Sequence, residues 1–173
     1  KRGLSNLRST ADALPAYIAP ENIDLFVKHG IYTEEEVRAR YEIHVENYRT
    51  VLSIEASTMI DMIRHEILPA VSKYAADLCA RAERKKSLGI PCAYETNTAL
   101  GIAEITDNLM EECRVLASDL EDMPAGPEEA MRYCHDTLIS DMGVARASVD
   151  ALEVLTASEY WPMPVYSELL FSV

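Results

Sequence analysis

The sequence is short of positive charge. Its 173 residues contain 16 lysines and arginines against 29 aspartates and glutamates, a formal net charge of -13. A chain with this balance repels phosphate backbones and anionic lipid surfaces, so we expect neither a nucleic-acid partner nor a membrane partner. No run of 18 apolar residues occurs, and the start KRGLSNLRSTADALP lacks the apolar segment of a signal peptide. We therefore expect a cytoplasmic chain.

Cysteine pairs with metal-site spacing are also absent. The four cysteines, at positions 79, 92, 113 and 134, are 13, 21 and 21 residues apart, and no C-x-x-C occurs. This spacing is poor for zinc. Cys79, Cys113 and Cys134 fall within helical patterns, which indicates small core residues in a reducing compartment.

The motifs of the common catalytic sites are missing as well. A two-metal carboxylate site in a helical bundle needs Glu three residues before His. The residues three positions before the four histidines are Phe26, Tyr41, Met62 and Arg132. The stretch YCHD sets Cys134 beside His135, but neighbours in a helix point about 100° apart and do not face each other. Because no glycine-rich phosphate loop occurs either, we expect no catalytic, cofactor-binding or metal residue in this chain.

Two polar groupings have a functional and a structural interpretation. The basic run Arg81, Arg84, Lys85 and Lys86 could bind an anion, but the last turn of a helix favours such a run because of the helix dipole. Glu55 and Asp61 could form buried pairs or lie on a solvated flank. We favour the solvated interpretation in both cases.

The hydrophobic spacing that is present predicts an all-α fold. A short N-terminal helix is expected over residues 21–29, with Pro20 near its start and Gly30 just past its end. Thr33 followed by Glu36 forms a capping-box pattern that opens a long helix, about residues 33–88. Its apolar residues, three or four apart, are Val37, Tyr41, Val45, Tyr48, Leu52, Ala56, Met59, Ile63, Ile67, Val71, Tyr74 and Leu78.

Pro69 lies inside this long helix. An interior proline removes one backbone hydrogen bond and its ring clashes with the carbonyl four residues back. Because the apolar spacing resumes in phase at Val71, we expect a kink around residues 64–69 and not a break.

Two shorter helices, about 96–121 and 127–157, should pack against the long one in an elongated antiparallel bundle. The stretch DMPAGPEE between them is expected to be a tight turn, with Pro127 at the first helical position. By length, these helices cover the second half of the long helix and little more. The apolar residues from Val37 to Ala56 then need another partner: the N-terminal segment, a second copy, or a domain absent from this chain.

The chain ends in a proline-broken aromatic stretch, EYWPMPVYSELLF. Pro162 and Pro164 cannot prolong a helix, and exposing its large apolar side chains would forfeit roughly 1.5 to 3 kcal/mol each. We expect an extended anchor with Trp161 buried near Gly89–Tyr94. The structural or interface residues expected in the whole chain are Thr33, Pro69, Trp161, Pro162, Pro164, Tyr166, Leu169, Leu170 and Phe171.

Four stretches resemble the C-terminal region of type III glutamine synthetases. They are NLRSTADALP at 6–15, IEASTMIDM at 54–62, ILPAV at 67–71 and WPMPVYSELLF at 161–171. The resemblance extends over essentially the whole chain, and the four stretches occur in the order expected for that family. The start at Lys1 instead of Met fits a piece of a longer polypeptide, and fits a processed chain equally well. The expected division is a linker segment with a short helix (1–32), a helical bundle (33–157) and the C-terminal anchor (158–173).

The resemblance implies a parent enzyme that joins ammonia to glutamate at the expense of ATP, with Mg²⁺, in a large homo-oligomer of stacked rings. It also implies that the metal-binding and nucleotide-binding residues belong to a catalytic domain absent from this chain. The chain alone would then be inactive, and its partners would be the parent catalytic domain and neighbouring subunits. The alternative is a free-standing helical protein–protein interaction module.

Overall fold

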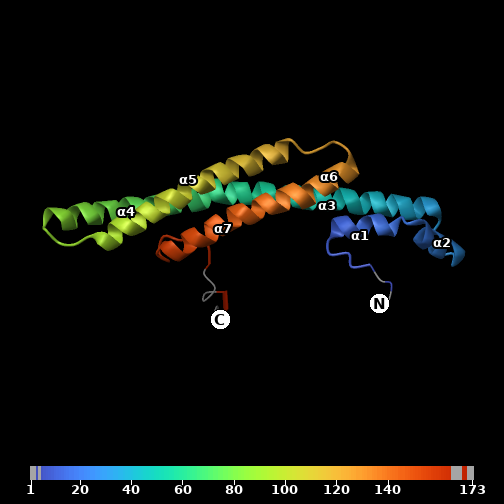
Figure 1. Cartoon of the computed structure of the whole chain (residues 1–173), viewed down its shortest axis with the longest axis horizontal. Coiled ribbons are helices and arrows are strands. Elements are labelled where there is room, and N and C mark those ends of the chain that lie inside the picture. Colours follow the sequence, from blue (N-terminus) through green and yellow to red (C-terminus); the bar gives the residue numbers. More distant parts are fainter. Residues whose placement is uncertain (1–2, 4, 165–168, 171–173) are drawn as a thin grey trace. The chain divides into compact units, whose positions relative to one another are not determined.

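The structure, a computed structural model, describes residues 3, 5–164 and 169–170. The elements in this part of the chain are all helical, which confirms the predicted class (Figure 1). In chain order they are α1 (Thr10–Tyr17), α2 (Pro20–Lys28), α3 (Glu34–Met62), η1 (Ile63–Ile67), α4 (Leu68–Ser87), α5 (Ala93–Glu121), α6 (Pro127–Tyr133), η2 (Cys134–Leu138) and α7 (Ile139–Leu155). No helix among these residues is both long and apolar enough to cross a membrane.

Contacts within the chain separate two units. The first unit comprises residues 1–55 and 119–140, and the second comprises residues 56–118 and 141–173. Each unit has its own buried core.

The first unit is built around the start of α3. Its buried cluster consists of Ala11 from α1, Tyr41 and Val45 from α3, and Met131 from α6. The partly buried residues packed against it are Leu14, Tyr17, Ile18 and Tyr48. The N-terminal segment therefore covers part of the apolar stripe that the sequence had left without a partner.

Helix α1 was not predicted from the sequence. Its start is capped by Ser9, whose Oγ accepts a hydrogen bond from the backbone N–H of Asp12 at 3.1 Å. Pro15 lies inside this helix, in a region that was expected to be a linker segment. The expected helix at 21–29 is confirmed as α2, which begins at Pro20.

The expectation that the last two helices cover only the second half of the long helix is wrong for α6. The connection between α5 and α6 is not a tight turn, because Met123 contacts Arg49 while Glu128 reaches Tyr41. Those two positions on α3 are eight residues, or about 12 Å, apart. Residues 123–128 thus run along α3 and place α6 beside its first half.

The long helix continues through Pro69 by means of the π-helical turn η1. The backbone N–H of Leu68 donates to the carbonyl of Ile63, five residues back instead of four. This wider turn relaxes the collision that the proline ring would otherwise make with a preceding carbonyl. The helix therefore runs without a break from 34 to 87, 54 residues, and is distorted where a kink was predicted. A second π turn, η2, was not predicted.

The core of the second unit lies between the long helix, α5 and α7. Its fully or nearly buried side chains include Ile63, Ile67, Val71, Leu78, Ile102, Leu109, Leu116 and Leu152. Each contributes roughly 1.5 to 3 kcal/mol by leaving water.

Cys113 and Cys134 are buried as expected, but the prediction for Cys79 is wrong. Cys79 is exposed because it follows the buried Leu78 and is rotated about 100° from it.

Candidate functional site

The C-terminal segment is attached to the second unit by a turn that follows α7. Thr156 closes the helix, since its hydroxyl donates to the Leu152 carbonyl at 2.7 Å. The backbone then bends back, and the amide of Trp161 donates to the Ala157 carbonyl at 3.2 Å. This turn presents two consecutive aromatic residues, Tyr160 and Trp161, to the helices.

Tyr160 packs on α4. Its ring centroid lies 5.0 Å from that of Tyr74, and its hydroxyl donates to Asp77 Oδ2 at 3.1 Å. Arg81, one turn further along α4, pairs with the same carboxylate oxygen at 2.6 Å. The hydrogen bond to Asp77, followed by burial, raises the pKa of Tyr160, so the hydroxyl keeps its proton and remains the donor.

The same face of α4 also contacts the start of α5. The hydroxyls of Tyr74 and Tyr94 are 3.5 Å apart, and this contact together with burial raises the pKa of Tyr74 to about 12. One turn beyond Arg81, Lys85 Nζ donates to Glu95 Oε1 at 2.5 Å. These residues, with Tyr160, Asp77 and Arg81, form a polar cluster that we call the α4 clamp.

Glu95 is the most buried charge of the α4 clamp. Its side chain is 7% exposed, and its second oxygen, Oε2, has no hydrogen-bond partner among the described residues. The hydrogen bond from Lys85 lowers the pKa of Glu95. A carboxylate buried in this way depends on one lysine, because an unpaired buried charge is strongly destabilising.

Trp161 is buried, with 8% of its surface exposed, which is the burial that the sequence predicted. Pro162 and Pro164 are exposed, and so are Leu169 (64%) and Leu170 (58%). Tyr166 and Phe171 lie outside the described residues. Of the expected anchor, the described part thus contributes one buried aromatic residue and two exposed leucines.

The two remaining expected residues lie in the long helix. Thr33 forms a capping box: its amide donates to Glu36 Oε2 at 2.8 Å, and the Glu36 amide donates to its hydroxyl at 3.2 Å. Pro69 lies two residues past η1. Both residues shape the helix locally, and neither is part of the α4 clamp.

The solvated interpretation holds for Glu55, Asp61, Arg84 and Lys86, but not for Lys85, which is partly buried and pairs with the buried Glu95. Glu55 and Asp61 are exposed. Of the basic run, Arg81 and Lys85 belong to the α4 clamp. Arg84 and Lys86 are exposed and pair with no other residue that the structure describes.

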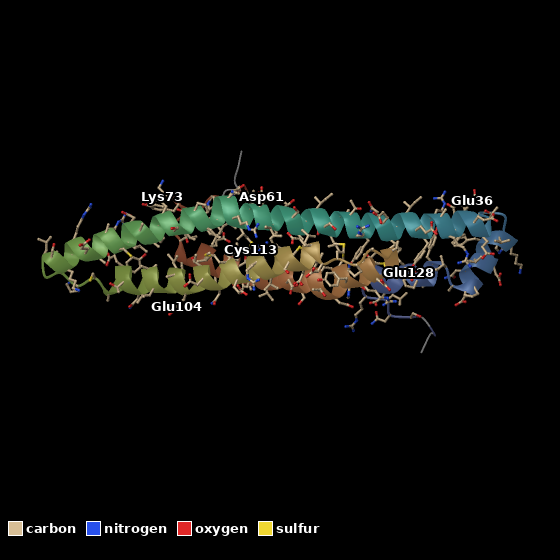
Figure 2. All side chains as sticks on the ribbon, turned by 90° about the horizontal axis from the view of Figure 1, so that it is seen from above. Glu36, Asp61, Lys73, Glu104, Cys113 and Glu128 are labelled. Atoms are coloured by element: carbon tan, nitrogen blue, oxygen red, sulfur yellow. The ribbon has the colours of Figure 1, made fainter. Side chains whose placement is uncertain are left out.

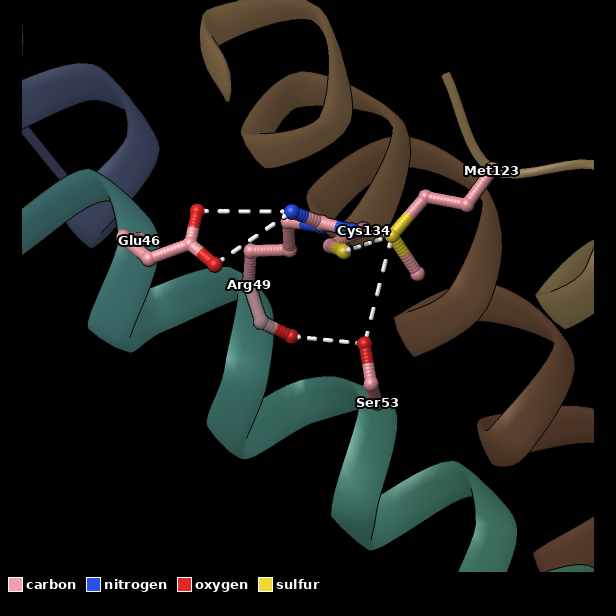
Figure 3. A network of polar contacts seen from close by, with 5 residues as sticks. All are labelled: Glu46, Arg49, Ser53, Met123 and Cys134. Carbon is pink, nitrogen blue, oxygen red and sulfur yellow. Dashed lines mark hydrogen bonds and ion pairs between the residues drawn. The ribbon is translucent and has the colours of Figure 1, made fainter. Parts of the chain in front are cut away.

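A group of sulfur contacts in the first unit was missed by the sequence reasoning (Figure 3). The thioether of Met123 accepts from Arg49 Nε at 3.4 Å, from the Ser53 hydroxyl at 3.9 Å and from the Cys134 thiol at 4.0 Å. Burial raises the pKa of Cys134, so its thiol keeps the proton that it donates. Glu46 pairs with Arg49 at 3.3 Å. No sequence signal points to this group, because its members are brought together only by tertiary packing.

The resemblance implies Mg²⁺ for the parent, so the described residues were compared with the needs of that ion. Across residues 3, 5–164 and 169–170, no three His, Cys, Asp or Glu side chains are grouped so that they could hold a metal ion. The described residues therefore do not fit that ion.

Comparison with known sequences gives the family. Residues 1–86 match the family model described as the glutamine synthetase C-terminal domain. A glutamine synthetase of Butyrivibrio fibrisolvens is 39% identical over 181 aligned positions that include all of this chain. The chain belongs to the glutamine synthetase C-terminal domain family.

Other members are more distant. The type-3 glutamine synthetase of Dictyostelium discoideum is 26% identical over 98% of the chain, and a glutamine synthetase of Bacteroides fragilis (strain YCH46) is 28% identical over 99% of it. The chain spans about a quarter of the length of these relatives, from 24% to 25%.

Proposed function

We propose that the chain is the non-catalytic C-terminal helical domain of a type III glutamine synthetase and that it serves domain and subunit packing. The parent would form glutamine from glutamate, ammonia and ATP with Mg²⁺, as a cytoplasmic homo-oligomer. Within the chain, residues 158–173 would act as the anchor to a neighbouring domain or subunit.

One observation carries the packing role. The α4 clamp fixes Tyr160 and Trp161 on the second unit, and Leu169 and Leu170 follow them with more than half of their surfaces exposed. Exposed leucines close in sequence to a docked aromatic pair suit a docking element, because each leucine gains roughly 1.5 to 3 kcal/mol if a partner buries it. Membership in the glutamine synthetase C-terminal domain family supports the parent activity.

The experiment compares the full-length parent with a version that lacks the residues aligned to this chain. We expect the shortened enzyme to lose its assembled state in analytical ultracentrifugation. The isolated chain, assayed with glutamate, ammonia, ATP and Mg²⁺, should form no glutamine. Normal assembly of the shortened enzyme, or turnover by the isolated chain after repurification, would overturn the proposal.

A free-standing interaction module is the alternative. The coding sequence upstream of Lys1 distinguishes the two, because a catalytic domain in the same reading frame excludes a free-standing module. The alternative requires an independent start immediately before this chain.

A further inference from the structure

The turn between α4 and α5 carries exposed apolar side chains beside exposed basic ones. Leu88 is 74% exposed and Ile90 is 48% exposed. Arg84 and Lys86 precede them in the last turn of α4, exposed and without an ion-pair partner among the described residues. We call residues 84–91 the tip. The tip combines apolar and cationic side chains, which is unusual in a chain of net charge -13.

The backbone of the tip is fixed before any partner arrives. Gly89 has φ +70, and the amides of Gly89 and Ile90 donate to the carbonyls of Lys86 at 3.1 Å and Lys85 at 2.9 Å. This is the hydrogen-bond pattern that ends helices on a left-handed glycine. Because the two apolar side chains stand on an ordered turn, docking costs little additional backbone entropy.

The first unit contains a pocket of opposite character. It lies along the start of α3 and has a volume of about 510 Å³. Its apolar lining residues, which we call its floor, are Ile18, Val45 and Pro127. Pockets of this volume accept groups the size of a few side chains. We call it the α3 pocket.

The charged side chains that line the α3 pocket, which we call its rim, are mostly acidic. Its carboxylates are Glu42, Glu46 and Glu128, and its one cation, Arg38, is already paired with Glu34 at 2.8 Å. Glu128 is held in place by the hydroxyl of Tyr41 at 2.7 Å, and burial raises the pKa of that hydroxyl to about 12. Glu42 is exposed and pairs with no other residue in the part that the structure describes.

We propose that the tip of one copy of this chain docks in the α3 pocket of a second copy. Leu88 and Ile90 would lie on the apolar floor, and Arg84 and Lys86 would face the carboxylates of the rim. The charges of the two surfaces are complementary, and both surfaces combine apolar with charged side chains. The tip and the pocket are different surfaces, so the contact is heterologous and leads to rings or open chains of copies.

This inference rests on the proposed packing role and names one contact within it. Its test is the association of this chain alone, whereas the proposed function is tested by the assembly and activity of the parent. The two can therefore fail separately.

Sedimentation velocity of the 173-residue chain across a micromolar concentration series is the first measurement. We expect the weight-average sedimentation coefficient to rise with concentration and to fall when salt is added, because salt screens the rim charges. A monomer throughout the series would overturn the proposal.

Charge reversal tests the pairing directly. Lys86→Glu and Glu42→Lys should each weaken self-association at least about tenfold, the change expected when one charged contact of the interface becomes repulsive. An equimolar mixture of the two variants should associate again, because each supplies the intact surface that the other lacks. Failure of the mixture to associate would overturn the assignment of tip to pocket.

Matched controls separate this contact from net charge and from loss of folding. Lys73→Glu and Glu104→Lys change the charge equally on outward-facing positions of α4 and α5 (Figure 2) and should leave association unchanged. Leu88→Ser with Ile90→Ser should abolish association, whereas Leu100→Ser, an exposed leucine outside the tip, should not. Circular dichroism verifies that each variant is folded. Equal effects of the tip variants and their controls would overturn the proposal.

Discussion

The hydroxyl of Tyr160 and the guanidinium of Arg81 share one acceptor, Oδ2 of Asp77, at 3.1 and 2.6 Å. The carboxylate therefore joins the segment after α7 to the middle of α4. Arg81, on the same helix, already pairs with Asp77. The carboxylate therefore loses little additional freedom when the hydroxyl of Tyr160 binds it. The C-terminal turn docks on a partner that is already arranged.

Two substitutions of Tyr160 distinguish the effect of its hydrogen bond to Asp77 from the effect of its ring packing against Tyr74. Tyr160→Phe removes the hydrogen bond but keeps the ring beside Tyr74, so we expect a small decrease in melting temperature and unchanged tryptophan emission. Tyr160→Ala removes both, and the emission of Trp161 should shift to the red as the turn loosens. Thermal melts followed by circular dichroism and by fluorescence measure both effects. A red shift in Tyr160→Phe as large as in Tyr160→Ala would contradict the expectation that the ring alone keeps Trp161 in place.

Trp161 is the only tryptophan and reports on the docked segment without a label. Because it is buried, we expect blue-shifted emission and poor quenching by iodide. Trp161→Ala should destabilise the chain by roughly 3 to 5 kcal/mol in urea unfolding, the range for large aromatic residues removed from a core. Val154→Ala, at an exposed position of α7, is the control and should change stability by less than about 0.5 kcal/mol. Emission like that of free tryptophan in water would contradict the burial.

The ion pair of Lys85 and Glu95 predicts how the stability of the chain changes at acidic pH. The pKa of Glu95 is lowered in the folded state, so its contribution to stability is present above the unfolded pKa of 4.5 and is lost as the pH falls through the lower folded value. Lys85→Met should destabilise the chain at neutral pH because Glu95 then keeps a buried charge without a partner. The loss should shrink on acidification, which neutralises Glu95.

The matched variants for this pair are Lys86→Met and the double change Lys85→Met with Glu95→Gln. Urea midpoints at neutral and at acidic pH compare them. We expect Lys86→Met to be near neutral, since Lys86 is exposed, and the double variant to be more stable than Lys85→Met alone. A double variant less stable than Lys85→Met would contradict the buried-charge explanation.

Tyr41 gives the corresponding prediction for alkali. Burial and the hydrogen bond to Glu128 raise its pKa from 10.0 to about 12. The folded state thus holds the phenolic proton more tightly, and stability is full below pH 10 and declines as the pH rises toward 12. Tyr41→Phe should cost about 1 kcal/mol at neutral pH and should reduce this alkaline decline. Urea midpoints across that range measure both, and an unchanged alkaline decline would contradict the assignment.

Local signals explain what the sequence could predict. The capping box of Thr33 and Glu36, the start of α6 at Pro127 and the end of α4 before Gly89 each depend on residues within one turn of one another. The burial of Trp161 followed from the composition of the last residues. Helix α1 also has a local signal, Ser9 three residues before Asp12, which the sequence analysis did not use.

The features that the sequence could not predict depend on how distant segments are aligned with one another in the folded chain. The spacing of the apolar residues cannot tell how far the chain travels between two helices, so the extended course of residues 123–128 and the contacts of Met123 were missed. The α4 clamp joins α4, the start of α5 and the segment after α7, three places that no periodicity links. The turn η1 had a hint in Pro69, whereas η2 contains no proline and no comparable mark.

The two π turns have a consequence for how the length of this domain can vary. A hydrogen bond to the fifth residue back encloses one residue more than an α turn does, so each π turn accommodates a single-residue insertion without rotating the faces on either side. At η2, deletion of one residue would restore an ordinary α turn and keep α7 in phase. At η1 the same deletion would return the ring of Pro69 to the carbonyl that the wide turn avoids. Of the two turns, we expect length differences among homologues to be tolerated at 134–138 and resisted at 63–67.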